Sequence, residues 1–137
     1  MAFQNPSDET IKEVLATPRT IAVVGCSPNP ERDSHRIAKL LQSRGHRVIP
    51  VNPGHQTILG ERCYATLRDI PERVEMVDIF RRSELVGPIV DEAIEVAARI
   101  VWMQLGVIDE QAAAKAQQAG LTVVMDRCPA IEYRRLF

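Results

Sequence analysis

The sequence has few aromatic residues, almost no net charge and no long apolar run, and each scarcity excludes a class of function. Phe, Trp and Tyr make up 4% of the 137 residues, so the chain has no base-stacking platform of the kind that single-strand nucleic-acid binders use. A formal net charge of −1 gives no general attraction to nucleic acid or to anionic membranes. No apolar run approaches the ~20 residues of a membrane span, and the first residues lack the basic and apolar regions of a secretory signal. We therefore expect a cytoplasmic protein that binds neither nucleic acid nor membrane.

Cysteine is also scarce, and the thiols are widely separated. Cys26, Cys63 and Cys128 are odd in number and form no CxxC pair, so neither a disulfide framework nor a zinc site is indicated. We expect no metal site. The chain is 45% hydrophobic and 26% charged, which is typical of a globular domain. We expect a single domain over residues 1–137, with residues 1–18 as a helical N-terminal extension and residues 20–137 as the core.

Short apolar runs alternate with helical patterns along the whole chain. The apolar runs are rich in β-branched residues and predict strands that are buried on both faces, at residues 21–24, 47–53, 76–80, 100–103 and 121–125. Helical spacing predicts helices over residues 7–16, 34–44, 88–97 and 109–119, and one or two further turns in residues 131–137. This alternation predicts an α/β fold, a Rossmann-like open sheet of about five parallel strands with helices on both faces.

Single proline, glycine and alanine positions add three details to this fold prediction. Pro50 lies inside the second strand, and because proline cannot donate to a ladder, we expect that strand at an edge of the sheet. Gly87 and Pro88 predict the N-cap and the first residue of a helix, and Ala97 is expected on its apolar face. Ala119 is expected to face inward from the helix that follows.

The loop after the first strand is the main candidate site, because ligands of open parallel sheets bind at the carboxyl ends of the strands. Gly25 ends that strand, and a helix begins at about Asp33 and Ser34, where unpaired N–H groups favour an anion. Of the three glycines of the NAD fingerprint GxGxxG, only Gly25 is present. Asn52 also stands where an acidic residue would bind a ribose hydroxyl. Both departures argue against NAD, and the missing carboxylate leaves space for a phosphorylated ribose.

Cationic residues follow several of the predicted strands. Arg32 follows the first loop, His55 follows the second strand, and Arg81 and Arg82 follow the strand that ends at Phe80. If the strands pair as predicted, these side chains meet at one edge of the sheet and form a polyanion site wider than one phosphate. The alternative is that each arginine is an ordinary solvated residue, and general chemistry does not name the ligand.

Six stretches, in order across nearly the whole chain, make the sequence similar to a known family. It resembles the small CoA-binding proteins related to the N-terminal domain of the succinyl-CoA synthetase α subunit. Each motif alone is weak, but the ordered set is specific. The stretches are IAVVGCSPNPER (21–32), VIPVNP (48–53), ILG (58–60), VDIFRRSE (77–84), VWMQLG (101–106) and DRCPAIE (126–132).

This resemblance implies that CoA or an acyl-CoA binds across the carboxyl ends of the strands. Residues 27–30 match the phosphate loop, and His55 lies where the synthetase subunit carries a lysine that meets the nucleotide end. Phe80 and Arg81 match the segment over which the nucleotide and the pantetheine pass, and residues 103–105 match the segment near the pantetheine arm. The cofactor-binding residues that the resemblance implies are Gly25, Cys26, Ser27, Pro28, Asn29, Pro30, Arg32, Asn52, Pro53, His55, Phe80, Arg81, Met103, Gln104, Leu105 and Gly106.

The resemblance implies binding but no ligase chemistry, because the second domain of the synthetase subunit, with its phosphorylated histidine, has no match here. We expect a CoA-binding protein with no catalytic residues of its own. Two alternatives stay open. One is an acyl-CoA-using enzyme (thioester hydrolysis or transfer) with Cys128 or Asp126 as its catalytic group, and the other is an NAD(P)- or nucleotide-binding sensor that acts with a partner. Besides the CoA ligand, a homodimer or an unknown protein partner also stays open.

Several residues near the implied site have competing interpretations. Cys26 is a candidate for a mixed disulfide with CoA, but the CoA thiol lies at the end away from the pyrophosphate, so the role of a small residue in a tight turn is favoured. Cys128 lies nearer the end of the arm, but nothing beside it resembles a general base, so a structural role is favoured. Trp102 either stacks on adenine or fills the core, and the core is favoured. Arg134 is expected to be solvated.

Overall fold

A parallel sheet organises residues 3–137, which are the residues that the computed structural model describes. Its strands are β1 (Thr20–Val24), β2 (Arg47–Val51), β5 (Met76–Ile79), β6 (Ile100–Met103) and β7 (Thr122–Met125). They lie in the order β2-β1-β5-β6-β7, and each pair of neighbours is parallel. The five-stranded sheet confirms the predicted Rossmann-like α/β class.

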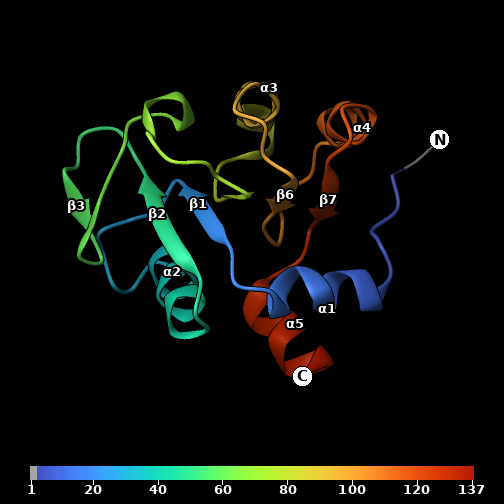
Figure 1. The fold of residues 1–137 in the computed structure, drawn as a ribbon, viewed down its shortest axis with the longest axis horizontal. Helices are drawn as coiled ribbons and strands as arrows, with labels where there is room; N and C mark the ends of the chain where they lie inside the picture. Colours follow the sequence, from blue (N-terminus) through green and yellow to red (C-terminus); the bar gives the residue numbers. More distant parts are fainter. Residues whose placement is uncertain (1–2) are drawn as a thin grey trace.

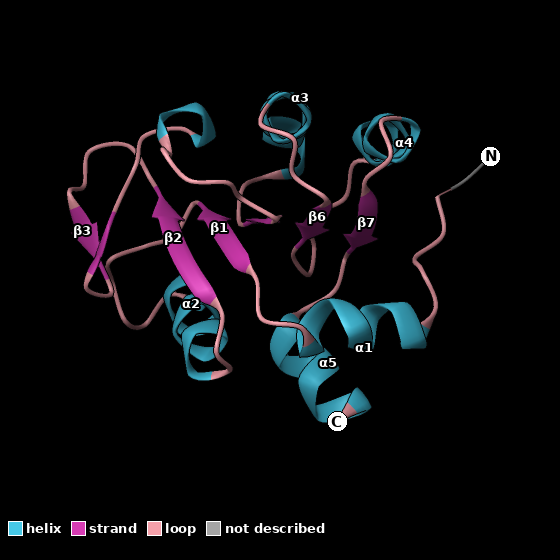
Figure 2. Cartoon of the chain, in the orientation of Figure 1, coloured by secondary structure: helices cyan, strands magenta, loops and turns pink. Residues whose placement is uncertain are grey.

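Helices cover both faces of this sheet (Figure 1, Figure 2). The face that we call the α3–α4 face carries α3 (Val86–Glu95) and α4 (Glu110–Gln118). The opposite face, which we call the α2–α5 face, carries α1 (Asp8–Ala16), α2 (Asp33–Ser43) and α5 (Pro129–Leu136). Among the described residues, no helix is long and apolar enough to span a membrane. The short elements are the antiparallel pair β3 (Thr57–Ile58) and β4 (Glu61–Arg62) and the 3-10 turns η1 (Leu67–Asp69) and η2 (Ser83–Leu85).

Successive side chains of each strand enter two different cores, because side chains alternate across a strand. In β1, Ala22 and Val24 belong to the core under α3 and α4, whereas Ile21 and Val23 belong to the core under α1, α2 and α5. This explains why the strands are apolar at successive positions.

Both edges of the sheet are partly covered by other parts of the chain. β2 is an edge strand, as the position of Pro50 predicted, and the Pro50 carbonyl accepts a 3.1 Å hydrogen bond from the amide of Tyr64. At the other edge, the side-chain amide of Asn5 bonds both the N–H and the carbonyl of Met125, at 2.7 and 2.9 Å. An asparagine therefore takes the place of a further strand residue at that edge.

Helix α1 forms at its predicted position and packs against α5. Ser7 caps it through a 3.2 Å bond from the amide of Thr10, and Asp8 pairs with Arg135 of α5 at 2.8 Å. Between the helices, His46 is buried, and its Nε2 lies 3.1 Å from the Leu15 carbonyl. The apolar face of α1 is thus part of the core of the α2–α5 face.

The structure corrects three details of the predicted helices. Helix α3 begins at Val86, because the η2 turn leads directly into it, and Pro88 is its third residue, where no intrahelical N–H bond is lost. Ala97 lies beyond the end of α3 with a φ of 61° and is exposed. Ala119 is also exposed, since it lies after the last residue of α4, and Ala113 takes the buried position instead.

Candidate functional site

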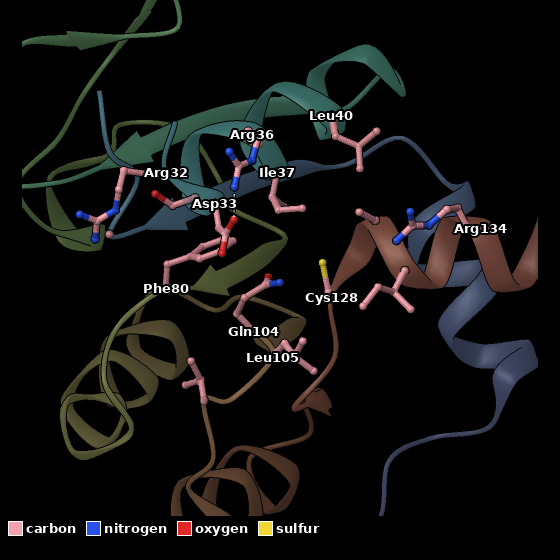
Figure 3. Close-up of a pocket in the computed structure, with 15 residues that line it drawn as sticks. Arg32, Asp33, Arg36, Ile37, Leu40, Phe80, Gln104, Leu105, Cys128 and Arg134 are labelled. Carbon is pink, nitrogen blue, oxygen red and sulfur yellow. Dashed lines mark hydrogen bonds and ion pairs between the residues drawn. The ribbon is translucent and has the colours of Figure 1, made fainter. Parts of the chain in front are cut away.

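A cavity of about 640 Å³ opens at the carboxyl ends of the strands on the α2–α5 face (Figure 3). Its volume falls within the range of small-molecule sites. The first turns of α2 and α5 both contribute to its wall, and the residues after β1, β5 and β6 form the rest. The lining residues are Gly25, Arg32, Asp33, Ser34, Arg36, Ile37, Leu40, Phe80, Gln104, Leu105, Val107, Cys128, Ala130, Ile131 and Arg134.

Gly25 is required where β1 ends because the chain there leaves no space for a side chain. Its φ is 87°, in the left-handed region, and a Cβ at this position would lie 2.3 Å from the carbonyl oxygen of Phe80. The Gly25 amide also donates a 2.8 Å bond to the carbonyl of Val51. Three neighbouring strand ends therefore meet tightly at this glycine.

The loop after Gly25 is held by its own side chains. The amide of Ser27 donates to Oγ of Ser34 at 2.9 Å. The amide of Asn29 donates to Oγ of Ser27 at 3.1 Å, and the amide of Glu31 donates to Oδ1 of Asn29 at 3.0 Å. Because Pro28 and Pro30 have no N–H, most of the loop donors are absent or already used. The loop is stiff, and its middle is not a cradle of free amides.

Free donors gather instead where the loop meets α2. Within the part of the chain that the structure describes, the amides of Asp33 and Ser34 have no hydrogen-bond acceptor. The positive end of the α2 dipole adds to them. Arg32 is exposed and has no ion pair among the described residues, whereas Arg36 pairs with Asp33 and offsets that carboxylate. This end of the cavity is suited to an anion.

Asn52 and the buried cysteines lie behind the loop and fix it. Nδ2 of Asn52 donates a 2.9 Å bond to the carbonyl of Cys26, and Sγ of Cys63 donates to the carbonyl of Asn52 at 3.3 Å. Cys26 is fully buried, and this burial raises the pKa of its thiol to about 12. The favoured interpretation of Cys26 as a small residue in a tight turn agrees with this position.

Two buried polar side chains on the α2–α5 side of the sheet have atoms without hydrogen-bond partners among the described residues. Gln104 is only 7% exposed, and its Oε1 has no hydrogen-bond partner within residues 3–137. Asp78 lies two residues before Phe80 on the same side of its strand, paired in register with Val23 and Trp102. Neither of its carboxyl oxygens has a partner among the described residues. Burial raises the pKa of Asp78 well above its ordinary value, because it disfavours the charged form of the carboxyl.

The other end of the cavity is formed by the first residues of α5. Cys128 is the N-cap residue of α5, is partly exposed, and makes no capping hydrogen bond through its side chain. Ile131 and Arg134 continue the wall along the helix. Figure 3 shows the sulfur of Cys128 directed into the space between Gln104 and Ile37.

The structure brings some of the sequence-predicted site residues together and separates others. Gly25, Arg32, Phe80, Gln104 and Leu105 line the cavity. Cys26, Ser27 and Asn52 support its wall from behind. The exposed residues Pro28, Asn29, Pro30, Pro53 and His55 and the half-buried Arg81 lie outside the lining, and Gly106 forms the turn after β6. Met103 packs in the core of the α3–α4 face, so its side chain does not reach the cavity.

Sequence reasoning missed the contribution of α5 to the cavity. Arg134 is exposed, as expected, and it also lines the wall together with Cys128, for which a structural role is favoured. The available signal was Pro129, since a proline is favoured at the first position of a helix. It marks α5 as a helix that begins at the carboxyl edge, opposite α2. Trp102 is fully buried, as favoured, and donates from its indole nitrogen to the carbonyl of Arg127 at 2.9 Å.

Comparisons with known proteins identify relatives of similar sequence and of the same fold. A family model described as a CoA binding domain matches residues 19–134. An uncharacterised protein, YneT of Bacillus subtilis, is 40% identical over 126 residues, which cover 92% of this chain and 93% of that protein. A hypothetical protein from Pyrococcus horikoshii OT3 has a solved structure that superposes with a TM-score of 0.91 at 40% identity, covering 99% of both chains.

Larger enzymes contain a similar region. An ADP-forming acetate–CoA ligase I of Archaeoglobus fulgidus is 36% identical over 80 residues, which span 58% of this chain but 12% of that enzyme. The structure of a dinucleotide-forming acetyl-coenzyme A synthetase 1 of Ca. Korarchaeum cryptofilum superposes with a TM-score of 0.72 at 25% identity, over 84% of this chain and 27% of that one. These matches confirm the resemblance that the six ordered motifs indicated, and the chain belongs to the CoA-binding domain family.

Proposed function

We propose that this protein binds CoA or an acyl-CoA at the carboxyl edge of its sheet. The observation that carries the proposal is the pair of free amides of Asp33 and Ser34 beside Arg32, at one end of a cavity whose other walls are largely apolar. Such an end suits the pyrophosphate, and the remaining cavity suits the pantetheine arm along Phe80 and Gln104. Membership of the CoA-binding domain family supports this choice of ligand.

The nucleotide end of the ligand is assigned to the outer side of the loop. Arg81 lies beside Gly25, with its Nε 3.4 Å from the place where a Cβ of that glycine would stand. His55 is exposed in the turn after β2. Asn52 stands where an acidic residue would oppose a 3′-phosphate, and its side chain bonds the Cys26 carbonyl.

The proposed role is binding without catalysis. Among the described residues that line the cavity there is no histidine, and the carboxylate of Asp33 is paired with Arg36. Asp126, in the turn before α5, accepts a 2.7 Å bond from the amide of Gly106. Both carboxylates are engaged by groups of the protein, which supports binding over thioester hydrolysis.

Isothermal titration tests the proposal with CoA, dephospho-CoA and NAD. We expect CoA to bind most tightly, dephospho-CoA more weakly and NAD least. Arg32→Ala should weaken CoA binding about tenfold, because one charge-assisted contact with phosphate is lost. Arg99→Ala is the matched control, since Arg99 is exposed at the amino end of β6, away from the cavity, and should leave the affinity unchanged.

Two outcomes would contradict the proposal. One is the absence of CoA binding in a folded protein that binds NAD tightly. The other is an equal loss of CoA affinity in both arginine variants. That result would show that the affinity depends on the overall charge of the protein and that Arg32 belongs to no defined phosphate site.

A further inference from the structure

The three thiols of the chain lie in very different surroundings. Cys26 is fully buried, and burial raises the pKa of its thiol to about 12. Cys63 is buried, its Sγ donates to the Asn52 carbonyl, and burial raises its pKa as well. Cys128 is partly exposed, lines the cavity, and makes no side-chain hydrogen bond within the described residues. Only this thiol is accessible to a bound ligand among the three.

The turn that presents Cys128 is rigid. The indole N–H of Trp102 bonds the carbonyl of Arg127 at 2.9 Å, directly before the cysteine. Asp126 adopts a φ of 59°, a left-handed conformation that costs energy in a residue with a side chain, and its Oδ1 accepts the amide of Gly106 at 2.7 Å. The sulfur is therefore held at a defined position in the cavity wall.

A second, independent feature of the same cavity is a buried polar side chain without partners. Gln104 is only 7% exposed and lines the cavity, yet its side-chain amide makes no hydrogen bond within residues 3–137. A buried amide without partners is costly, and an amide group of a ligand would satisfy it. The pantetheine arm carries amide groups and ends in a thiol. Figure 3 shows Gln104 and Cys128 on the wall of the same cavity, so an arm that bonds Gln104 brings its sulfur toward Cys128.

We propose that Cys128 captures CoA as a mixed disulfide by exchange with a disulfide of CoA. The inference rests on the proposed CoA binding and adds a redox-dependent covalent state to the same site. The Cys128 thiolate attacks one sulfur of CoA disulfide, so that a Cys128–S–S–CoA bond forms while the original S–S bond breaks. The second CoA leaves as a thiolate and takes up the proton that the cysteine released. The reaction is an exchange, and the disulfide is its only oxidant.

Intact-mass spectrometry without reductant tests the proposal on the purified full chain. Incubation with CoA disulfide should add the mass of one CoA less two hydrogens per chain, and dithiothreitol should remove it. Oxidised glutathione, a disulfide without a nucleotide, should react at least about tenfold more slowly at equal concentration, because it lacks the binding that positions CoA. Cys128→Ser should abolish the adduct, whereas the control Arg99→Ala, at an exposed position away from the cavity, should form it like the wild type.

Three results would overturn the proposal: an adduct that persists in Cys128→Ser, peptide mapping of the wild-type adduct to another cysteine, or equal rates with the two disulfides. The mapping needs no variant, so it holds even if a substitution disturbs folding. Titration of reduced Cys128→Ser with CoA separates this inference from the proposed function. If CoA binds that variant but no adduct forms on the wild type, covalent capture fails while CoA binding stands.

Discussion

The two faces of the sheet are built from the same strands, but their interiors differ. Beneath α3 and α4, the core consists of aliphatic side chains, alanines and methionines. In the part of the chain that the structure describes, the buried polar residues lie on the α2–α5 side or at the strand ends that open to it, namely Ser34, His46, Asp78, Gln104 and Glu132. The cavity is on this same side.

This difference lies in how the buried polar groups of the two faces are compensated. Burying a polar group is unfavourable unless a partner compensates it. His46 is compensated by the Arg19 amide, the Leu15 carbonyl and the Tyr133 hydroxyl, at 3.0–3.1 Å. Asp78 and Gln104 have no such partners among the described residues. The α3–α4 face stabilises the sheet, and the α2–α5 face keeps polar atoms that a purely structural core would exclude.

The largest expected effect is at Gly25, where the cavity wall meets the strand ends. Gly25→Ala should lower the free energy of unfolding by about 3 kcal/mol, because it combines a left-handed φ with a clash. The added Cβ would stand 2.3 Å from the Phe80 carbonyl oxygen. Because the same movement distorts the loop, CoA binding should also be lost. Urea denaturation and calorimetric titration measure the two effects.

Gly54→Ala is the matched control for this substitution. Gly54 has nearly the same φ, 88°, but a Cβ there would meet no atom within 4 Å. We expect it to cost only about 1 kcal/mol, from the backbone conformation alone, and to leave the cavity intact. Equal losses of the free energy of unfolding in the two variants would show that the close approach of Gly25 to Phe80 does not contribute to the destabilisation.

The next largest effect is expected at Asp78, whose buried carboxyl has no partner among the described residues. Asp78→Val should raise the free energy of unfolding at neutral pH by about 1–3 kcal/mol, since two buried oxygens without partners are removed. This would make the α2–α5 core resemble the α3–α4 core. A loss of stability at neutral pH would show instead that a buried water or another group compensates the acid.

The same residue gives the protein a distinctive pH dependence. Burial raises the pKa of Asp78 far above its ordinary value of 3.8, so the folded protein keeps a proton that the unfolded chain releases. The contribution of Asp78 to stability therefore falls as the pH rises above about 4, until the raised pKa is passed. Asp78→Asn removes this slope, and urea denaturation from pH 4.5 to 8 measures it. Burial lowers the pKa of His46, so His46 destabilises both the wild type and Asp78→Asn below about pH 6.5. This contribution cancels when the two free energies of unfolding are subtracted.

The sequence determines the sheet more directly than the helix ends. The strand runs, the edge position of Pro50 and the cap of α1 at Ser7 are local signals, and the structure contains each of them. The predicted start of α3 is too late because the preceding turn has no strong sequence signal. The hydrogen bond that the amide of Leu85 donates to the carbonyl of Arg82 in this turn is evident only from the three-dimensional structure. Ala97 and Ala119 were misplaced because spacing alone does not show where a helix stops.

For the site, the sequence identified the strand ends and the α2 end of the cavity but not the α5 end. Gly25 and Arg32 follow from the strand–loop–helix order, which the chain itself displays. The positions of Cys128 and Arg134 depend on where α5 packs after the last strand, and that is a tertiary property. The partners of Asn52 and the isolation of Gln104 likewise depend on residues distant in sequence.

The smallest expected effect, and the most selective one, is at Gln104. Gln104→Leu should weaken CoA binding about tenfold through loss of one buried hydrogen bond. It should leave the free energy of unfolding unchanged or slightly higher, because Oε1 has no partner in the protein to lose. Gln117→Leu, at an exposed position of α4 on the other face, should change neither quantity. If Gln104→Leu instead lowers stability and leaves CoA affinity intact, the residue is a structural part of the core. The polar character of the α2–α5 face would then need an explanation other than ligand binding.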